Sequence, residues 1–334
     1  MATIKDVASQ AGVSATTVSI ILNGKSETRK ISKATQEKVW QAVRELNYHP
    51  NISARKLRSD ESHKPTIAIY WSKDFETFLM SRFLRGLQDG VISQYQFDLV
   101  ICPYEKDTLH AERGLKNTSM FHAAIIMSAS EKDMVYLEEN EPLIPIILFN
   151  RTSEKFSSVN IDNSASEQAA LHFARKGIKN VALITADSSY YAMELRLRAF
   201  INACEEQKLI LKREHIITAE HSIRGGVEAA EKLLAANPPP ALFCDSDFLA
   251  AGVLYVCQKN GVRIPQDLEI ITMAMTGRRS SEFTIPPLTI IDFPMEKMAA
   301  ACLQIISDII KLNASAPEHR YFETPLIIRA SSPR

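Results

Sequence analysis

The stretch "AGVSATTVSIILNG", residues 11–24, has the pattern of a tight turn followed by a short helix. Gly12 can adopt the left-handed backbone conformation that such a turn requires. Ser14 is a favourable N-terminal cap, because its hydroxyl can accept a hydrogen bond from the first turn of a helix. Asn23 and Gly24 are typical of a helix end. We therefore expect a helix over residues 15–22.

Two further helices flank this stretch. Thr3 and Asp6 predict the start of a first helix that runs to about Gln10. A third helix is expected after Ser32, and its apolar residues recur at helical spacing, so we expect them to cover the first two helices. These residues are Val39, Trp40, Val43 and Leu46. Two short helices joined by a turn containing glycine form a helix-turn-helix, which predicts a DNA-binding domain over residues 1–49.

The second helix of this motif would expose small and apolar side chains. Val18 and Leu22 share the face expected to point at the other helices, and Ile21 is expected at the edge of that face. Small and apolar side chains can read the thymine methyl group, supplemented by a hydroxyl hydrogen bond. The residues expected outward are Ala15, Thr16, Ser19 and Ile20, of which Ala15, Thr16 and Ile20 would contact bases. The alternative is that Ile20 is a core residue.

Other polar residues of the segment are suited to the DNA backbone. Ser14, Thr17 and Asn23 can donate hydrogen bonds to phosphates, which positions a domain without reading sequence. Residues 1–58 carry ten basic side chains against four acidic ones, whereas the whole chain has a net charge of zero. A basic N-terminal segment on an acidic body indicates a protein that binds a polyanion.

The segment "YHPNISARKLRS", residues 48–59, has two open interpretations. Pro50 ends the third helix, because a residue before proline avoids the helical conformation. Asn51 can cap a short helix that runs through Leu57. The segment could order on DNA and insert an apolar wedge into the minor groove, or it could be a basic linker. Its apolar stripe is Ile52, Ala54 and Leu57, and its basic residues are Arg55, Lys56 and Arg58.

The composition of the whole chain favours a soluble globular protein of two or three domains. Its 334 residues are 46% hydrophobic and 23% charged, and no apolar run reaches the ~20 residues needed to span a membrane. The N-terminus lacks the apolar segment of a secretory signal. The five cysteines are scattered and form no C-x-x-C pair, which suits a reducing cytosol and predicts neither disulfides nor a zinc site. We expect no cofactor.

Strand-like and helix-like segments alternate after residue 65. This alternation predicts an α/β body with parallel sheets covered on both faces, in two lobes with a cleft between them. The expected strands are 66–71, 97–103, 123–129, 145–150, 181–185, 215–218, 241–245, 268–274 and 288–292. The expected helices include 167–177, 192–207, 225–237 and 248–261.

The segments "TIKDVASQAGVSATTVSIILNG", "ISKATQEKVWQAVRELNYHPN" and "SARKL" together resemble the N-terminal domain of the LacI/GalR family of bacterial transcription regulators. The resemblance implies a homodimer whose recognition helices enter successive major grooves of a near-palindromic operator. Leu57 matches the minor-groove wedge, and Ala54 lies where the paired hinge helices pack. Many members have Arg in place of Ile20. The candidate DNA-binding residues are Thr3, Ser14, Ala15, Thr16, Thr17, Ser19, Ile20, Asn23, Tyr48, Asn51, Ala54, Arg55 and Leu57.

The body resembles the family's two-lobed, periplasmic-binding-protein-like (type I) effector domain. The segments "PIILFNR", "NIDNSASEQAALHFARKGIKNVALIT", "RLRAF", "ALFCDSDFLAAGVLYVCQKNGVRIPQDLEII" and "PPLTIIDFPMEKMA" carry this resemblance. It implies that the chain crosses between the lobes near Asp162, Asp292 and Phe322. The expected boundaries are a hinge helix and linker over 50–60 and an effector-binding and dimerisation domain over 61–334, with an N-lobe of 61–161 and 293–321 and a C-lobe of 162–292 and 322–334.

The resemblance also implies where an effector would bind. Arg196 matches the arginine that fixes the effector in most members, and His221 matches a ring that stacks on it. The candidate effector-binding residues are Asn150, Arg196, His221, Ser246, Asp247 and Phe293. Ala274 replaces the first of two aspartates that clamp sugar hydroxyls, and Phe293 replaces a polar residue. The cleft could therefore hold a less hydroxylated ligand, an anion met by Arg196, or nothing.

These patterns favour a DNA-binding transcriptional repressor over the other classes of protein. We expect a cytoplasmic bacterial homodimer, associated with the nucleoid, that binds double-stranded operator DNA and a small effector such as a sugar or related metabolite. A protein corepressor in place of the effector is the main alternative, and a sugar-binding protein without a DNA role is a weaker one. The chain has no nucleotide-binding, hydrolase or zinc-protease motif, so we do not expect an enzyme. The end of the chain has no leucine heptads, which predicts a dimer and not a tetramer.

Overall fold

The computed structural model describes residues 4–22, 31–46, 64–73, 77–91, 97–116, 120–140, 142–187, 191–312 and 317–334. The chain divides into two compact units, Met1–His63 and Lys64–Arg334. Within these described residues, no helix is both long enough and apolar enough to cross a membrane.

The first unit contains the predicted helix-turn-helix. Its helices are α1 (Ile4–Ala11), α2 (Ala15–Leu22) and α3 (Lys33–Glu45). Gly12 has the positive φ angle of 65° that the turn was expected to need. The Ser14 hydroxyl caps α2 by accepting a hydrogen bond from the backbone N–H of Thr17 at 3.1 Å. The predicted bounds of the second helix are confirmed.

The core of this unit corrects two predictions. Ile21 is only 2% exposed and lies in the core with Val18, not at the edge of the buried face. Trp40 is 42% exposed and does not cover the other helices. The inward stripe of α3 consists of the buried Val39 and Ala42 and the partly buried Val43, and it continues to Leu46 just after the helix. These positions follow the 3, 1, 3 spacing of one helix face, and Trp40 lies about 100° around the helix from Val39.

The second unit contains two six-stranded sheets. The N-lobe sheet has the order β11-β5-β4-β3-β1-β2, and the C-lobe sheet has the order β12-β10-β9-β8-β6-β7. All strand pairs are parallel except β10 with β12. The N-lobe strands are β1 (Thr66–Ser72), β2 (Asp98–Tyr104), β3 (Ala123–Met127), β4 (Ile146–Phe149), β5 (Ser157–Ile161) and β11 (His319–Phe322). The C-lobe strands are β6 (Asn180–Ala186), β7 (Ile210–Ala219), β8 (Ala241–Cys244), β9 (Glu269–Ala274), β10 (Thr289–Asp292) and β12 (Leu326–Ile327).

All nine predicted strands are confirmed, and three more are present. β5 reads "SSVNI" and is buried although three of its five residues are polar. β11 reads "HRYF" and alternates between exposed and half-buried residues at the edge of its sheet. Neither segment has the apolar run on which the prediction depended. The third is β12, which contains two residues.

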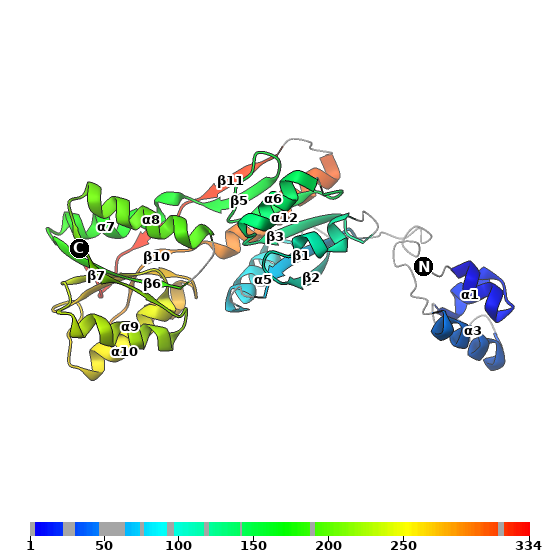
Figure 1. Cartoon of the computed structure of the whole chain (residues 1–334), viewed down its shortest axis with the longest axis horizontal. Helices are drawn as coiled ribbons and strands as arrows, with labels where there is room; N and C mark the ends of the chain where they lie inside the picture. Colours follow the sequence, from blue (N-terminus) through cyan, green and yellow to red (C-terminus); the bar gives the residue numbers. More distant parts are fainter. Residues whose placement is uncertain are drawn as a thin grey trace. The chain divides into compact units, whose positions relative to one another are not determined.

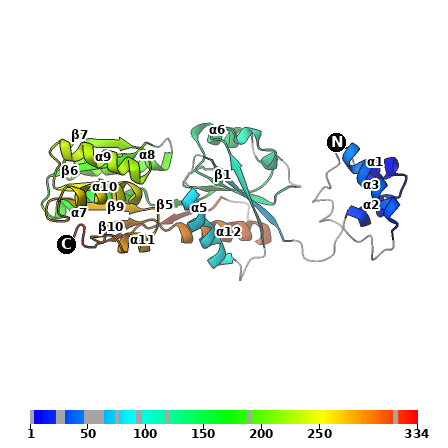
Figure 2. The same ribbon diagram turned by 90° about the horizontal axis from the view of Figure 1, so that it is seen from below.

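Helices cover both faces of each sheet, as Figures 1 and 2 show. In the C-lobe, α7 and α8 cover one face, and α9 and α10 cover the other. In the N-lobe, α5 and α12 pack on one face, and α6 packs on the other. The helices of the body are α5 (Thr77–Val91), α6 (Glu131–Asn140), α7 (Glu167–Arg175), α8 (Tyr191–Glu206), α9 (Ile223–Ala235), α10 (Asp247–Lys259), α11 (Arg278–Glu282) and α12 (Met295–Leu312). Short 3-10 helices are η1 (Leu109–Ala111), η2 (Arg113–Lys116) and η3 (Asn163–Ala165).

The chain passes between the two lobes three times. It leaves the N-lobe sheet after β5, returns after β10 through α12 to β11, and enters the C-lobe sheet again at β12. Each lobe is therefore assembled from separated segments of the sequence. The loops that follow the N-lobe strands and the start of α8 meet at this junction, where a cavity lies.

Candidate functional site

The outward face of α2 consists of small and apolar side chains. Thr16 is exposed, and Ala15, Ser19 and Ile20 are partly exposed. Ala15 also packs against the core of the first unit, whereas Ile20 is absent from that core cluster and from the residues packed against it. The structure therefore does not support the alternative that Ile20 is a core residue. The hydroxyls of Ser14 and Thr17 are 2.9 Å apart at the start of the helix.

Seven candidate DNA-binding residues lie outside the described residues. They are Thr3, Asn23, Tyr48, Asn51, Ala54, Arg55 and Leu57. The predictions for the hinge segment and its minor-groove wedge stay predictions.

A cavity of about 110 Å³ lies between the two lobes of the body. The N-lobe contributes residues that follow β4 and residues of β5 and β11, and the C-lobe contributes one face of α8. The lining residues are Asn150, Arg151, Thr152, Asn160, Ile161, Tyr191, Ala192, Leu195, Arg196 and Tyr321. Of the six candidate effector residues, the cavity brings together Asn150 and Arg196. Asn150 has a left-handed backbone with a φ of 55°, a conformation that few non-glycine residues adopt and that is frequent at functional sites.

Arg196 is buried without a carboxylate partner among the described residues. Its side chain comes from α8 and is 7% exposed. Its Nη1 donates to the sulfur of Met273 at 2.9 Å and lies 3.8 Å from that of Met275. Its Nε has no hydrogen-bond partner in the described part of the chain. Burial lowers the pKa of this guanidinium, and the charge of Asp245 opposes that shift. A thioether is a weak acceptor, so the charge of Arg196 is poorly compensated.

The Asp245 carboxylate is engaged on the other side, by β6. It accepts hydrogen bonds from the Thr185 hydroxyl and from the backbone N–H of Ala186, the latter at 3.1 and 3.2 Å. Burial raises the pKa of Asp245, while the Thr185 hydroxyl, the Arg196 charge and the Ala186 N–H lower it. Asp245 therefore attracts Arg196 electrostatically without forming an ion pair that satisfies it.

His221, Ser246 and Asp247 form a separate polar group that does not line the cavity. His221 Nε2 and the Ser246 hydroxyl are 2.7 Å apart, and this hydroxyl also caps α10 by accepting from the Phe248 N–H at 3.2 Å. Burial, reinforced by the charge of Arg196, lowers the pKa of His221 to about 4. Asp247 accepts a hydrogen bond from the Thr276 N–H at 2.9 Å. Among the described residues, no three His, Cys, Asp or Glu side chains are grouped to hold a metal ion.

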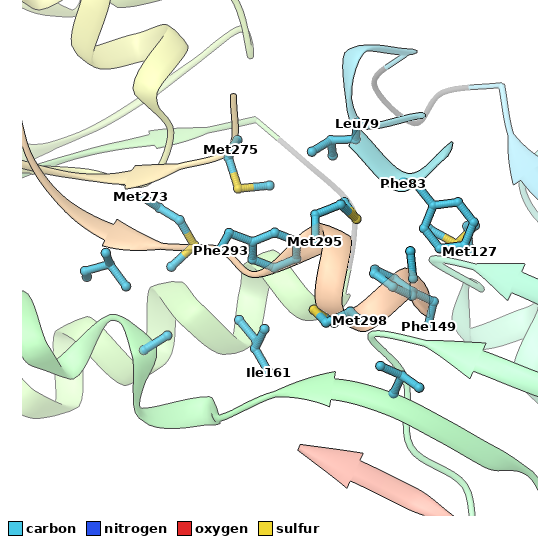
Figure 3. Packing of buried hydrophobic residues seen from close by; sticks show 14 of the residues in the cluster. Leu79, Phe83, Met127, Phe149, Ile161, Met273, Met275, Phe293, Met295 and Met298 are labelled. Atoms are coloured by element: carbon cyan, nitrogen blue, oxygen red, sulfur yellow. The ribbon is translucent and has the colours of Figure 1, made fainter. Parts of the chain in front are cut away.

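Methionine and phenylalanine side chains fill the junction beside the cavity, as Figure 3 shows. Phe293 is 1% exposed and belongs to this apolar cluster together with Met273, Met275, Met295 and Met298. Phe293 is not among the residues that line this cavity, because its ring packs into a core that is continuous between the two lobes. Its role in effector binding stays a prediction.

Met273 and Ala274, at the end of β9, lie on opposite faces of the C-lobe sheet. Successive side chains of a strand point to opposite faces. Ala274 belongs to the apolar cluster on the α9 and α10 side of the sheet, whereas Met273 and Met275 belong to the cluster that contacts Arg196. Met273 and Met275 therefore contact Arg196, and the replacement of an acidic clamp by Ala274 stays a prediction.

Arg151 lines the cavity and was not predicted as a site residue. It is the second residue after β4, is 5% exposed, and its Nη2 donates to Glu131 Oε1 at 2.9 Å. Its guanidinium carbon lies 4.1 Å from the ring centroid of Tyr191. The available signal was the position of the "NR" pair immediately after a buried strand, where ligands of parallel sheets bind.

Arg82 ties the two lobes together beside this junction. It extends from α5 of the N-lobe, and its Nε and Nη2 donate to the Glu296 carboxylate at 2.9 and 2.6 Å. It also donates to the carbonyl oxygens of Met275 and Phe293, each at 2.9 Å. A single buried side chain thus joins the end of β9 and the crossing segment before α12 to the N-lobe.

The described architecture matches known proteins along nearly the whole chain. Residues 3–51 match the model of bacterial regulatory proteins of the lacI family, and residues 170–332 match that of periplasmic binding protein-like domains. The chain is 30% identical to the HTH-type transcriptional repressor PurR of Aliivibrio salmonicida, covering 97% of this chain and 96% of that protein. It is 27% identical to the probable HTH-type transcriptional repressor ExuR of Bacillus subtilis, covering 99% and 98%.

A crystal structure of a LacI family transcription regulator from Clostridium acetobutylicum is similar with a TM-score of 0.77. It is 45% identical in sequence, and the match covers 80% of this chain and all of the other. These relatives are named as transcription regulators. The chain belongs to the lacI family of bacterial regulatory proteins and is a DNA-binding transcriptional regulator.

Proposed function

We propose that the protein represses transcription as a homodimer that binds a near-palindromic operator through α2 and responds to a small molecule in the cavity between the lobes. The observation that carries the ligand-binding part is the buried Arg196, which lines this cavity and whose Nε has no hydrogen-bond partner among the described residues. A buried, uncompensated cation is costly in a protein that has no ligand for it.

The reading face of α2 is Ala15, Thr16 and Ile20. Ser14 and Thr17 stand at the N-terminal end of the helix, where backbone N–H groups and hydroxyls suit a phosphate. With no Arg, Lys, Asn or Gln on α2, base contact falls to methyl groups and the Thr16 hydroxyl. The preferred operator therefore has thymines at the steps that these side chains face.

The effector would bind where Asn150 of one lobe and Arg196 of the other line the same cavity. A ligand that contacts both lobes favours the arrangement of lobes in which both sets of contacts form. That change in the lobes alters the spacing of the two DNA-binding units of the dimer. Operator affinity then depends on the ligand, and by linkage ligand affinity depends on the operator to the same degree.

Two surface observations bear on the partner. The apolar side of α5 is buried, because Leu79, Phe83 and Leu87 lie in the N-lobe core, so it offers no docking face to a protein corepressor. The edge strand β2 leaves Leu99 and Ile101 each 38% exposed. The first observation gives no support to a protein corepressor, and the second provides apolar surface for a second copy of the chain.

The test of this function begins with selection of bound sequences from random duplex DNA at a stated salt concentration. The expected result is an enriched near-palindrome of two half-sites, bound by two chains per duplex in sedimentation. A library of metabolites is then screened for compounds that change the affinity for the enriched duplex. Failure to enrich any palindrome would remove the repressor function, and binding of one chain per duplex would remove the dimer.

A further inference from the structure

Two buried arginines, one from each lobe, line the cavity. Arg151 follows β4 in the N-lobe and Arg196 lies on α8 of the C-lobe. The two residues are 5% and 7% exposed. Each guanidinium keeps one buried nitrogen without a hydrogen-bond partner among the described residues, Nη1 of Arg151 and Nε of Arg196. Unpartnered donors of this kind are rare in folded proteins and indicate a missing acceptor.

The contacts of Arg151 hold it in place and use only part of its guanidinium. Glu131, whose side chain is 73% exposed, accepts a hydrogen bond from Nη2 alone. The Tyr191 ring, which begins α8 in the other lobe, stacks on the guanidinium at 4.1 Å. This stack and the ion pair fix the plane of the guanidinium, and Nη1 stays buried without a hydrogen-bond partner among the described residues.

The contacts of Arg196 also leave part of its guanidinium without a hydrogen-bond acceptor. Its Nη1 meets two thioether sulfurs, and the nearby Asp245 carboxylate is engaged by Thr185 and Ala186. Two guanidinium groups beside one small cavity also repel each other, because the surrounding protein screens charge less than water does. A ligand with two negative charges supplies an anionic acceptor to each guanidinium and offsets their repulsion. A neutral sugar supplies no anionic acceptor.

The size of the cavity limits the ligand to a small molecule. Its volume of about 110 Å³ lies below the ~300 Å³ at which drug-sized pockets begin. Asn150, Thr152 and Tyr321 add side chains that can bond hydroxyl groups. The small volume and the polar lining suit a short hydroxylated chain better than a pair of sugar rings.

We infer that the effector is a short organic diacid, with one acidic group on Arg151 and the other on Arg196. The inference rests on the proposed function, since it names the ligand class of the same cavity. Arginine binds a carboxylate through two parallel N–H groups, so each end of the ligand is fixed in orientation as well as in charge. Because the two ends contact different lobes, the diacid binds most tightly when the lobes approach each other.

The test compares ligands that differ only in the number of acidic ends. The full-length protein is titrated by calorimetry with tartrate, threonate and threitol, which share four carbons and have two, one and no carboxylates. Glucarate, gluconate and glucitol form a matched six-carbon series. In at least one series, we expect the diacid to bind more than about tenfold tighter than the monoacid, which corresponds to one charge-assisted hydrogen-bonded contact, and the neutral compound to bind weakest.

Matched variants assign each acidic end to its arginine. Arg151→Gln should weaken the diacid about tenfold or more and leave the monoacid within about twofold, because the monoacid uses Arg196. Arg196→Gln should weaken both acids. The control is Arg213→Gln, since Arg213 is exposed on β7 and should change neither affinity. The thermal unfolding midpoint of each variant establishes that it is folded before titration.

The outcomes separate this inference from the proposed function. A neutral sugar that binds as tightly as the diacid and changes operator affinity leaves the repressor function standing and overturns the diacid. The diacid is also overturned if the Arg151→Gln variant binds the monoacid and the diacid with equal losses of affinity, or if neither diacid binds. Loss of operator binding by the wild-type protein overturns the proposed function itself.

Discussion

The guanidinium of Arg196 donates a hydrogen bond of 2.9 Å to the thioether sulfur of Met273. A thioether sulfur is a weak acceptor, so an arginine that contacts sulfur instead of a carboxylate keeps most of its charge uncompensated. This relationship makes the cavity attractive to an acid, and it follows from the identity of two methionines at the end of β9.

A carboxylate introduced beside Arg196 should therefore weaken the binding of an acidic ligand. In the Met275→Glu variant, we expect the new carboxylate to pair with Arg196, whose Nη1 is 3.8 Å from the sulfur of Met275. Affinity for an acidic ligand should fall by more than about tenfold. The neutral variant Met275→Gln is the control, and calorimetry is the measurement. Equal losses for Glu and Gln would show that shape, and not charge, governs binding.

His221 should make the protein less stable in acid. Burial, together with the Arg196 charge, lowers its pKa to about 4 in the folded state, whereas the ordinary value is 6.5. The unfolded chain therefore binds a proton in a range where the folded chain does not, and the free energy of unfolding falls as the pH drops from 6.5 to 4. We expect a contribution of roughly 2 to 3 kcal/mol across this window and none above it.

The measurement is urea unfolding of wild type and His221→Gln at pH 7 and pH 4.5. The variant should lose less stability than wild type on acidification, because it lacks the titrating ring. Exposed His110 provides the control in a His110→Gln variant, which should follow wild type. A His221→Gln variant with the same pH dependence as wild type would contradict this assignment.

Arg82 should be a major source of stability at the lobe junction. It satisfies both oxygens of Glu296 and the carbonyls of Met275 and Phe293. Arg82→Ala leaves these acceptors without a donor, and we expect it to lower the free energy of unfolding by about 3 to 5 kcal/mol. Arg82→Lys should recover only part of that loss, since lysine lacks the planar fork. Exposed Arg85 on the same helix is the control, and Arg85→Ala should change stability by less than ~0.5 kcal/mol. Similar losses at both positions would refute the role.

Gly86 permits the close approach of α5 to α12. An added Cβ would lie 2.3 Å from the carbonyl oxygen of Glu296, which is backbone and cannot turn away. Gly→Ala in an unobstructed helix stabilises by about 1 kcal/mol. Here we expect the opposite sign, a loss of about 1 to 3 kcal/mol in urea unfolding. Gln88→Ala, at an exposed position of α5, is the control. A more stable Gly86→Ala variant would contradict the observed packing.

Ile20 should read thymine methyl groups. Replacing thymine by uracil at the contacted step of the selected operator should weaken binding by roughly 1 kcal/mol, the worth of one buried methyl group. The Ile20→Ala protein should be insensitive to the same replacement, and a uracil outside the bound site should have no effect on either protein. Fluorescence anisotropy measures both affinities. Equal sensitivity of the two proteins would remove Ile20 from the reading face.

Local patterns in the sequence were sufficient for the helix-turn-helix. Its caps, its glycine turn and its helical spacing are determined by neighbours in the chain, and Ser14 and Gly12 act as the pattern predicts. The nine apolar strands of the body were predictable for the same reason, since a buried parallel strand is a continuous apolar run. Trp40 and Ile21 were misplaced because hydrophobicity does not specify which of two adjacent helical positions faces inward.

Tertiary structure alone decided the composition of the cavity. Arg151 and Arg196 are 45 positions apart and belong to different lobes, and their cavity exists only because the chain crosses between two sheets. The register of β9 decides which side of the sheet Met273 and its neighbours Ala274 and Met275 face. A shift of one residue would reverse these sides. Sequence therefore determined the elements and the family, through interactions local to each segment. The charge balance of the site depends on contacts between distant segments, and only the folded chain specifies these.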